Sequence, residues 1–130
     1  MNVNVAGVAV MTQKFLPLLL KSKDKKNRMV LNISSSLGSI DLANHHNSTS
    51  YRCTKSALNM LTKTFALEFP KIIFIAMHPG WVASEMGSAQ GRSPPVTIEE
   101  SCSSMVNVVE QRTKEDSGSF WNFEGKKMPY

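Results

Sequence analysis

The chain has 130 residues, a length that fits one domain or a large part of one. Hydrophobic residues make up 42% of it, which argues against an intrinsically disordered chain. The net charge is +5, but five of the 15 basic residues lie within residues 21–28, and no aromatic residue is interleaved with them. We therefore expect a solvated helix-to-strand loop at residues 21–28 and no nucleic-acid binding.

The first predicted element is an amphipathic helix over residues 5–20. Apolar residues recur there at steps of three and four, which predicts that one face of the helix carries Val8, Met11, Phe15 and Leu18. Pro17 lacks a backbone donor and is expected to kink the last turn. Residues 1–20 have no basic leading segment and contain several polar residues, so we expect neither a signal peptide nor a membrane span.

Short apolar runs then alternate with longer helical runs. The predicted strands are residues 29–34, 72–77 and 119–123, the second helix is residues 51–69, the third helix begins after Thr97, and the loops are residues 35–50 and 81–96. This order predicts an α/β domain in which right-handed crossovers place the three strands side by side in parallel. Ligands bind such sheets beyond the carboxyl ends of the strands. Ser35 follows the first strand and Pro79-Gly80 follows the second, so we expect the functional site there.

The second and third helices also carry apolar stripes. The stripe of the second helix is Leu58, Leu61 and Phe65, and Pro70 ends that helix. Thr97 and Glu100 have the spacing of a capping box, which opens the third helix. The stripe predicted for the third helix is Ile98, Cys102, Met105 and Val109.

Tyr51 and Lys55 are four residues apart on the second helix, so their side chains lie on one face. A free phenol has a pKa of about 10. An ammonium group close by favours the phenolate, so we expect Lys55 to lower the pKa of Tyr51 toward the range useful for a general acid or base. The pair alone is a weak signal, because a tyrosine and a lysine often occur at this spacing on solvated helices.

Four ordered motifs strengthen the signal. They are N-I-S-S-S-L-G-S-I at residues 32–40, Y-R-C-T-K-S-A-L-N-M-L at 51–61, H-P-G-W-V at 78–82 and E-D-S-G-S-F at 115–120. With these motifs the sequence resembles the short-chain dehydrogenase/reductase family, and most of all its branch of C-factor and sniffer-type carbonyl reductases. The resemblance implies a Rossmann-like, doubly wound parallel sheet and an NAD- or NADP-dependent oxidoreductase, with NADP slightly favoured. The implied reaction reduces a small carbonyl compound or oxidises a secondary alcohol.

The resemblance also implies roles for four catalytic residues. Tyr51 would be the general acid/base, and Lys55 would assist Tyr51 and bind the nicotinamide ribose. Ser35 would hydrogen-bond the substrate oxygen, with Ser34 and Ser36 as alternatives that could instead cap local backbone. Asn4 would support a proton-relay water, although a helix N-cap explains it equally well. Asn2 competes for the Asn4 role.

The same resemblance implies a cofactor-binding set of Tyr51, Lys55, Pro79, Gly80, Val82 and Ser84. Pro79-Gly80 would be the turn beside the nicotinamide, although an ordinary strand-ending turn would look the same. Val82 would offer backbone to the carboxamide, and Ser84 stands where the family usually has threonine. Trp81 and Met86 would help to cover the substrate by analogy with the family's lid.

The cysteines and histidines carry weaker signals. Cys53 and Cys102 have neither disulfide nor metal spacing, which predicts a reducing, cytoplasmic setting. His45 and His46 lack accompanying ligands, so we expect a solvated loop and no metal site. His78 is expected to cap the end of the second strand.

The sequence departs from the family in one large respect. None of the 7 glycines forms the G-x-x-x-G-x-G turn that places the cofactor pyrophosphate at a helix N-terminus. Residues 1–130 therefore look like the carboxyl-terminal part of a single Rossmann-like domain, and the strand at 29–34 would have an unprotected edge prone to association. The alternative function is a truncated, catalytically silent relative that acts as an association module, with a homodimer through helices 5–20 and 51–69.

Overall fold

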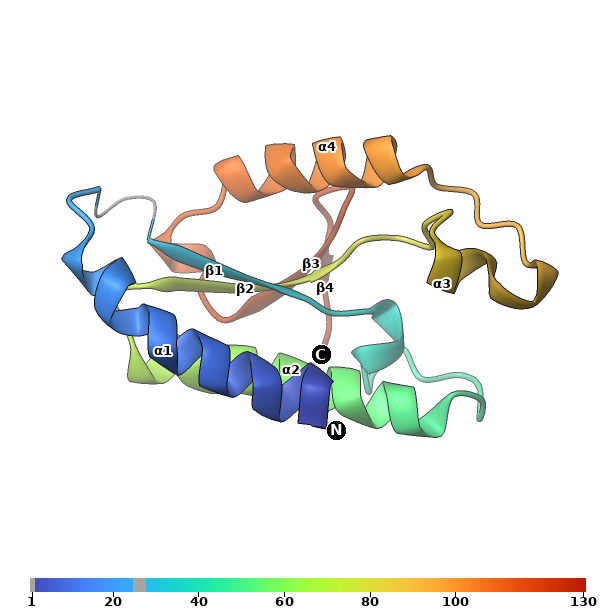
Figure 1. Ribbon diagram of the computed structural model, residues 1–130, viewed down its shortest axis with the longest axis horizontal. Coiled ribbons are helices and arrows are strands. Elements are labelled where there is room, and N and C mark those ends of the chain that lie inside the picture. Colours follow the sequence, from blue (N-terminus) through green and yellow to red (C-terminus); the bar gives the residue numbers. More distant parts are fainter. Residues whose placement is uncertain (1, 25–27) are drawn as a thin grey trace.

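The computed structural model describes residues 2–24 and 28–130 and shows a sheet between two layers of helices (Figure 1). The strands are β1 (Met29–Ile33), β2 (Ile73–His78), β3 (Ser119–Asn122) and β4 (Lys127–Met128). The α-helices are α1 (Val8–Lys21), α2 (Thr49–Glu68), α3 (Glu85–Ser88) and α4 (Ile98–Glu110). Shorter helical turns are η1 (Asn2–Gly7), η2 (Ser36–Gly38), η3 (Ala89–Gly91) and η4 (Lys114–Asp116). Helices α1 and α2 cover one face of the sheet and α4 covers the other.

The sheet has the order β1-β2-β3-β4. β1 pairs with β2 and β2 pairs with β3 in parallel, which confirms the predicted α/β arrangement. β4 pairs antiparallel with β3 and was not predicted from the sequence. Lys127–Met128 is too short to show an alternating pattern, and it is positioned by a turn in which Gly125 takes a φ of +83°.

The core lies on both faces of β2, which is almost entirely buried. Phe74 packs with Leu16 and Phe65 beneath α1 and α2. On the opposite face, Ile73, Ile75 and Met77 pack with Val108 of α4. The alternation follows from the two-residue period of a strand, and burial on both faces is typical of a central parallel strand.

The apolar stripe predicted for the first helix is correct in position but is not buried. Met11, Phe15 and Leu18 are 57%, 51% and 63% exposed, whereas Thr12 and Leu16 are the buried residues of α1. Pro17 lies inside this helix, which continues for four more residues to Lys21. By length and composition alone, the segment Val3–Lys21 is long and apolar enough to cross a membrane, a property shared by core helices of soluble proteins and by signal sequences.

The stripe predicted for the third helix is confirmed at Met105 and Val109, which pack against the core, and is wrong at its other two positions. Ile98 and Cys102 are exposed, while Ser101 and Val108 are the buried residues of α4. The reason is local, because the Ser101 hydroxyl donates a hydrogen bond of 2.7 Å to the Pro79 carbonyl and turns that side of the helix inward.

Two predicted loops contain more structure than expected. The loop at 81–96 holds α3 and η3, and the loop at 35–50 holds η2. The solvated loop predicted at 21–28 is wrong at Arg28, which is buried and donates a hydrogen bond of 2.6 Å to the Ser22 carbonyl. Residues 25–27 lie outside the described part of the chain.

A matched pair of substitutions tests this distribution of burial. Ile75 is fully buried in β2 and Ile33 is 44% exposed at the end of β1. Removing one methyl group from a packed core costs about 0.5–1.5 kcal/mol, so we expect Ile75→Val to lower the free energy of unfolding by that amount. Ile33→Val should change the free energy of unfolding by only a few tenths of the amount expected for Ile75→Val. Urea unfolding followed by circular dichroism measures both, and equal losses would contradict the packing described.

Candidate active site

The junction between β1 and α2 positions the predicted catalytic pair. Lys55 Nζ donates a hydrogen bond of 2.7 Å to the Ile33 carbonyl at the end of β1. The same nitrogen lies 5.6 Å from the centre of the Tyr51 ring, because the two residues are one helical turn apart. Burial lowers the pKa of Lys55 below its ordinary value of 10.5. The arrangement places a partly desolvated cation beside a phenol.

Gly38 lets the η2 turn rest directly on α2. A Cβ atom at Gly38 would lie 2.7 Å from Lys55 Cβ and 2.8 Å from the Lys55 carbonyl carbon, which is closer than atoms can approach. The Gly38 carbonyl accepts hydrogen bonds from the Ser56 hydroxyl at 2.9 Å and the Asn59 side-chain amide at 3.2 Å. The turn that follows β1 is thereby fixed to the helix that carries Tyr51 and Lys55.

The three serines after β1 have different partners. The buried Ser34 hydroxyl donates a hydrogen bond of 2.6 Å to the Asn59 side-chain oxygen. The Ser35 hydroxyl accepts from the Leu37 backbone N–H at 3.2 Å, which leaves its own hydrogen free to donate. Ser36 is half-buried at the start of η2. Of these serines, Ser34 has its donor engaged within the fold and Ser35 does not.

The turn after β2 forms the facing wall. His78 ends β2, as predicted, and Gly80 takes a φ of +88°, a conformation that glycine adopts without strain. Val82 forms an isolated parallel bridge with Val96. The Ser84 hydroxyl accepts a hydrogen bond of 3.2 Å from the Gly87 N–H and caps α3.

These segments enclose a cleft of about 670 Å³ at the carboxyl ends of the strands. Its lining includes six of the residues predicted for the site: Ser35, Tyr51, Pro79, Gly80, Val82 and Ser84. The alternatives Ser34 and Ser36 also line it. The Tyr51 hydroxyl makes no hydrogen bond to any described residue, so it is free to bind a ligand in the cleft.

Lys55 and Asn4 are not among the residues that line the cleft. Asn4 Nδ2 donates to the Thr54 hydroxyl at 3.3 Å, and that hydroxyl donates to the Tyr51 carbonyl at 2.8 Å. Asn4 therefore contacts α2 one residue before Lys55, and it lies within η1 instead of capping a helix. The competing Asn2 has its side chain outside the described part of the structure.

Sequence reasoning missed several contributors to the site, among them Ser48, Arg92 and Asn59. Ser48 lines the cleft in a left-handed conformation with a φ of +56°. Arg92 also lines it and donates to the carbonyls of Met86 at 3.1 Å and Ala89 at 2.8 Å, which holds the segment after α3 in place. Asn59 has a sequence signal, because a polar residue one turn after Lys55 stands on the inner face of α2, where apolar residues are expected.

His78 lines the cleft and has a shifted pKa. Burial lowers the pKa of His78 below its ordinary value of 6.5, and the Glu124 carboxylate opposes part of this shift. Its buried Nδ1 has no hydrogen-bond partner among the described residues. Folding therefore favours the neutral imidazole.

Comparison with known proteins identifies the family. The family model for short chain dehydrogenases matches residues 1–94, and the chain belongs to this family. The short-chain dehydrogenase srdF of Neurospora crassa is 32% identical over 99% of the chain, and the C-signal protein of Myxococcus xanthus is 28% identical over 99%.

Solved structures support the same assignment and the predicted branch. The NADPH-bound carbonyl reductase from chicken fatty liver is 38% identical over 98% of the chain, with a TM-score of 0.88. The carbonyl reductase Sniffer of D. melanogaster is 29% identical over 99%, with a TM-score of 0.90. The chain covers 54% of srdF, 75% of C-signal, 54% of the chicken enzyme and 55% of Sniffer. It therefore spans about half the length of most of these relatives, and the predicted truncated Rossmann-like fold is confirmed.

The low pKa of His78 predicts an acid-sensitive fold. Below pH 6.5 the unfolded chain binds a proton at His78 more readily than the folded chain does, so stability falls as the pH drops through this region, by at most about 1.4 kcal/mol per pH unit. We expect His78→Gln to remove this part of the pH dependence. His45→Gln, at an exposed position, should retain it. Urea midpoints from pH 7 to 5 measure the effect, and parallel curves for wild type and His78→Gln would contradict it.

Proposed function

We propose that this chain is the catalytic half of an NADP-dependent carbonyl reductase in which Tyr51 gives a proton to the substrate oxygen. The observation that carries the proposal is the free Tyr51 hydroxyl in the cleft, with the Lys55 ammonium 5.6 Å from its ring. The similarity to an NADPH-bound carbonyl reductase supports the choice of reaction and cofactor. The complete set of polar groups favours an oxidoreductase over a catalytically silent association module.

Each residue has a distinct part in the proposed reaction. Ser35 donates its free hydroxyl hydrogen to the carbonyl oxygen and orients it. Tyr51 transfers its proton to that oxygen as negative charge develops there. Lys55 stabilises the phenolate that remains, since an ammonium close to a phenolate favours the charged form. Asn4 acts behind this group by supporting α2 through Thr54.

The residues present suit the nicotinamide end of the cofactor. When bound, the reduced nicotinamide supplies the hydride that the carbonyl carbon receives. Gly80, Val82 and Ser84 would hold it from the wall after β2, and Lys55 retains two ammonium hydrogens for the ribose beyond the one given to Ile33. The described glycines are not clustered into a turn suited to the pyrophosphate, so the fit of this chain extends to the nicotinamide end alone.

The partners of this chain follow from the same site. The substrate is a small carbonyl compound, and its apolar part would lie against Trp81 and Met86 at the rim of the cleft.

A homodimer through α1 and α2 is a second possible partnership, because Met11, Phe15 and Leu67 on these helices are all more than half exposed.

Reduced nicotinamide mononucleotide tests the proposal with the chain as it exists, because this probe carries the nicotinamide end without the pyrophosphate. We expect the wild-type chain to accelerate its oxidation by 4-nitrobenzaldehyde, followed by absorbance. Tyr51→Phe should reduce the rate by about 10²–10⁴-fold, the usual contribution of a positioned acid.

Two matched variants complete this experiment. Ser35→Ala should also lower the rate, since the substrate oxygen loses its donor. Thr64→Ala replaces an exposed hydroxyl on the far part of α2 and should leave the rate unchanged. No acceleration by the wild-type chain, or equal rates for wild type and Tyr51→Phe, would overturn the proposed function.

A further inference from the structure

Arg92 is a cation in the cleft that the proposed reaction does not use. It follows α3 and η3, and α3 stands at the carboxyl end of β2 (Figure 1). Of the described residues that line the cleft, Arg92 alone has a fixed charge, because the lining includes no Asp, Glu or Lys. An uncompensated positive charge in a ligand cleft favours a ligand that carries a negative charge.

The backbone holds the guanidinium of Arg92 in place. Its Nε donates a hydrogen bond of 2.8 Å to the Ala89 carbonyl, and its Nη2 donates one of 3.1 Å to the Met86 carbonyl. A guanidinium has five N–H groups, so three stay unengaged, including both on Nη1. Within residues 2–24 and 28–130 Arg92 forms no ion pair, not even with Glu85 of α3. The fold therefore orients the guanidinium and leaves it donors for a further acceptor.

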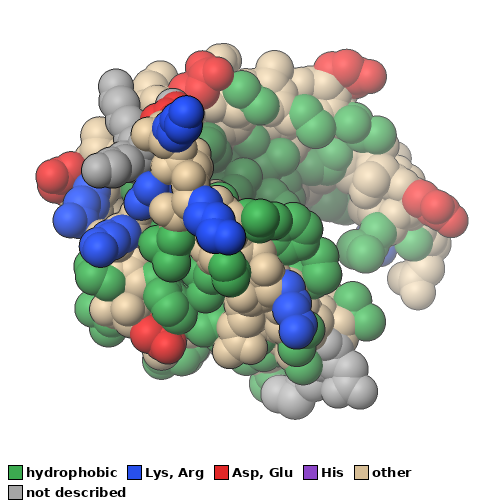
Figure 2. All heavy atoms as spheres, turned by 60° about the vertical axis from the view of Figure 1, so that its left-hand side comes forward, with side chains coloured by type: hydrophobic (Ala, Val, Ile, Leu, Met, Phe, Trp, Pro, Cys, Tyr) green, Lys and Arg blue, Asp and Glu red, His purple; other side chains and the backbone are tan. Residues whose placement is uncertain are grey.

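Other basic side chains gather at the opposite end of the sheet. Figure 2 shows the end of the molecule where α1 ends and β1 begins, and several Lys and Arg side chains lie there. Lys71, two residues before β2, also lies at the amino ends of the strands. The cleft lies at their carboxyl ends, so the charge of Arg92 is separate from this basic end of the molecule.

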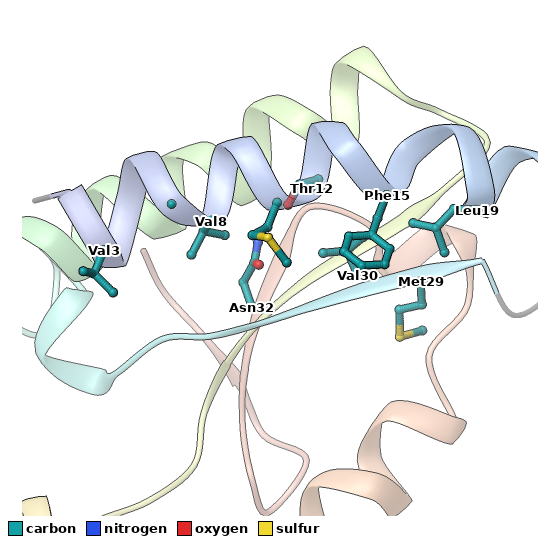
Figure 3. A pocket seen from close by; sticks show the side chains of 10 residues that line it. Val3, Val8, Thr12, Phe15, Leu19, Met29, Val30 and Asn32 are labelled. Atoms are coloured by element: carbon teal, nitrogen blue, oxygen red, sulfur yellow. The ribbon is translucent and has the colours of Figure 1, made fainter.

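The groove between α1 and β1 offers an anion no comparable partner. This second hollow, of about 750 Å³, is lined by apolar side chains together with Thr12 and Asn32 (Figure 3). None of its described lining residues is charged. An anionic ligand is therefore expected in the cleft and not in the groove, because burying a charge without a partner is costly.

We propose that Arg92 binds a carboxylate on the substrate, so that the preferred substrate is a carbonyl compound that also carries a carboxylate group. The inference rests on the proposed function, which places the carbonyl oxygen at Tyr51 and Ser35. The planar guanidinium matches a carboxylate through two parallel hydrogen bonds. The cleft, of about 670 Å³, lies within the usual range of small-molecule sites and has room for a compound that carries both groups.

A phosphate of the cofactor is the other anion that could reach Arg92, but its position favours the substrate. The Met86 carbonyl accepts from Arg92, and Trp81 Nε1 donates a hydrogen bond of 3.2 Å to the Gly87 carbonyl. Arg92 and Trp81 are thus both fixed to α3, and Trp81 and Met86 form the rim assigned to the substrate. The nicotinamide end of the cofactor is assigned to the wall directly after β2.

Equilibrium binding tests the proposal without any reductant. The matched ligands are 4-acetylbenzoate and 4-acetylbenzamide, which share their shape and their ketone but differ in charge. We expect the 130-residue chain to bind the acid about three- to tenfold more tightly than the amide, because the charge-assisted hydrogen bonds form at a solvent-exposed arginine. NMR titration measures both dissociation constants.

Three variants show which charge is responsible. Arg92→Gln should remove the preference for the acid, and Arg92→Lys should keep part of it, because the charge remains without the planar fork. Lys71→Gln removes one charge from an exposed position at the opposite end and should keep the full preference. Losing the hydrogen bonds to Met86 and Ala89 would weaken acid and amide alike, so the ratio of the two affinities isolates the charge. Circular dichroism checks that each variant folds.

Three outcomes would overturn the proposal. The first is equal affinity of the wild-type chain for acid and amide. The second is a preference for the acid that persists in Arg92→Gln or is also lost in Lys71→Gln, which would assign it to other charges. The third is weaker binding of nicotinamide mononucleotide by Arg92→Gln with an unchanged ratio of acid to amide affinity, which would make a cofactor phosphate the anion.

This test can fail or succeed separately from the test of catalysis. A chain that prefers the acid but does not accelerate the oxidation of reduced nicotinamide mononucleotide would keep the carboxylate site and lose the proposed reaction. A chain that reduces 4-nitrobenzaldehyde but binds acid and amide equally would keep the reaction and lose the carboxylate site.

Discussion

The contact between Lys55 and the Ile33 carbonyl, 2.7 Å long, joins α2 to the end of β1, and the arrangement of the site depends on it. Together with the hydrogen bonds of Ser56 and Asn59 to the Gly38 carbonyl, it holds the phenol of Tyr51 and the hydroxyl of Ser35 in a fixed relation. Gly38 makes the contact possible, because any side chain there would meet the backbone of Lys55. A short-range steric constraint and one charged hydrogen bond thus define where the chemistry takes place.

The central strand supports the cleft from below. β2 is buried on both faces and carries the core, so the cleft at its carboxyl end rests on the most stable part of the sheet. The open groove lies on the other side of β1, beneath α1.

Much of this structure could be predicted from the sequence because the relevant signals are local. The strands, the long helices and the spacing of Tyr51 and Lys55 follow from periodicity, and the cleft follows from parallel topology. Burial could not be predicted where it depends on a partner element. Phe15 looks like a core residue by spacing yet is exposed, and Arg28 looks like a loop residue yet is buried beneath the end of α1. Asn59 shows the same limit, because its side chain hydrogen-bonds to Ser34 and to the Gly38 carbonyl, and both residues lie more than 20 positions away in the sequence.

The ionisation of Lys55 tests this account most directly, because the account requires a cation that is buried between β1 and α2. Carbon-13 NMR of the Lys55 side chain can follow its titration, with Lys55→Arg used to assign the signal. The account predicts a pKa for Lys55 below 10.5, since burial disfavours the ammonium form. A pKa at or above 10.5 would contradict the partly buried placement of Lys55 between β1 and α2.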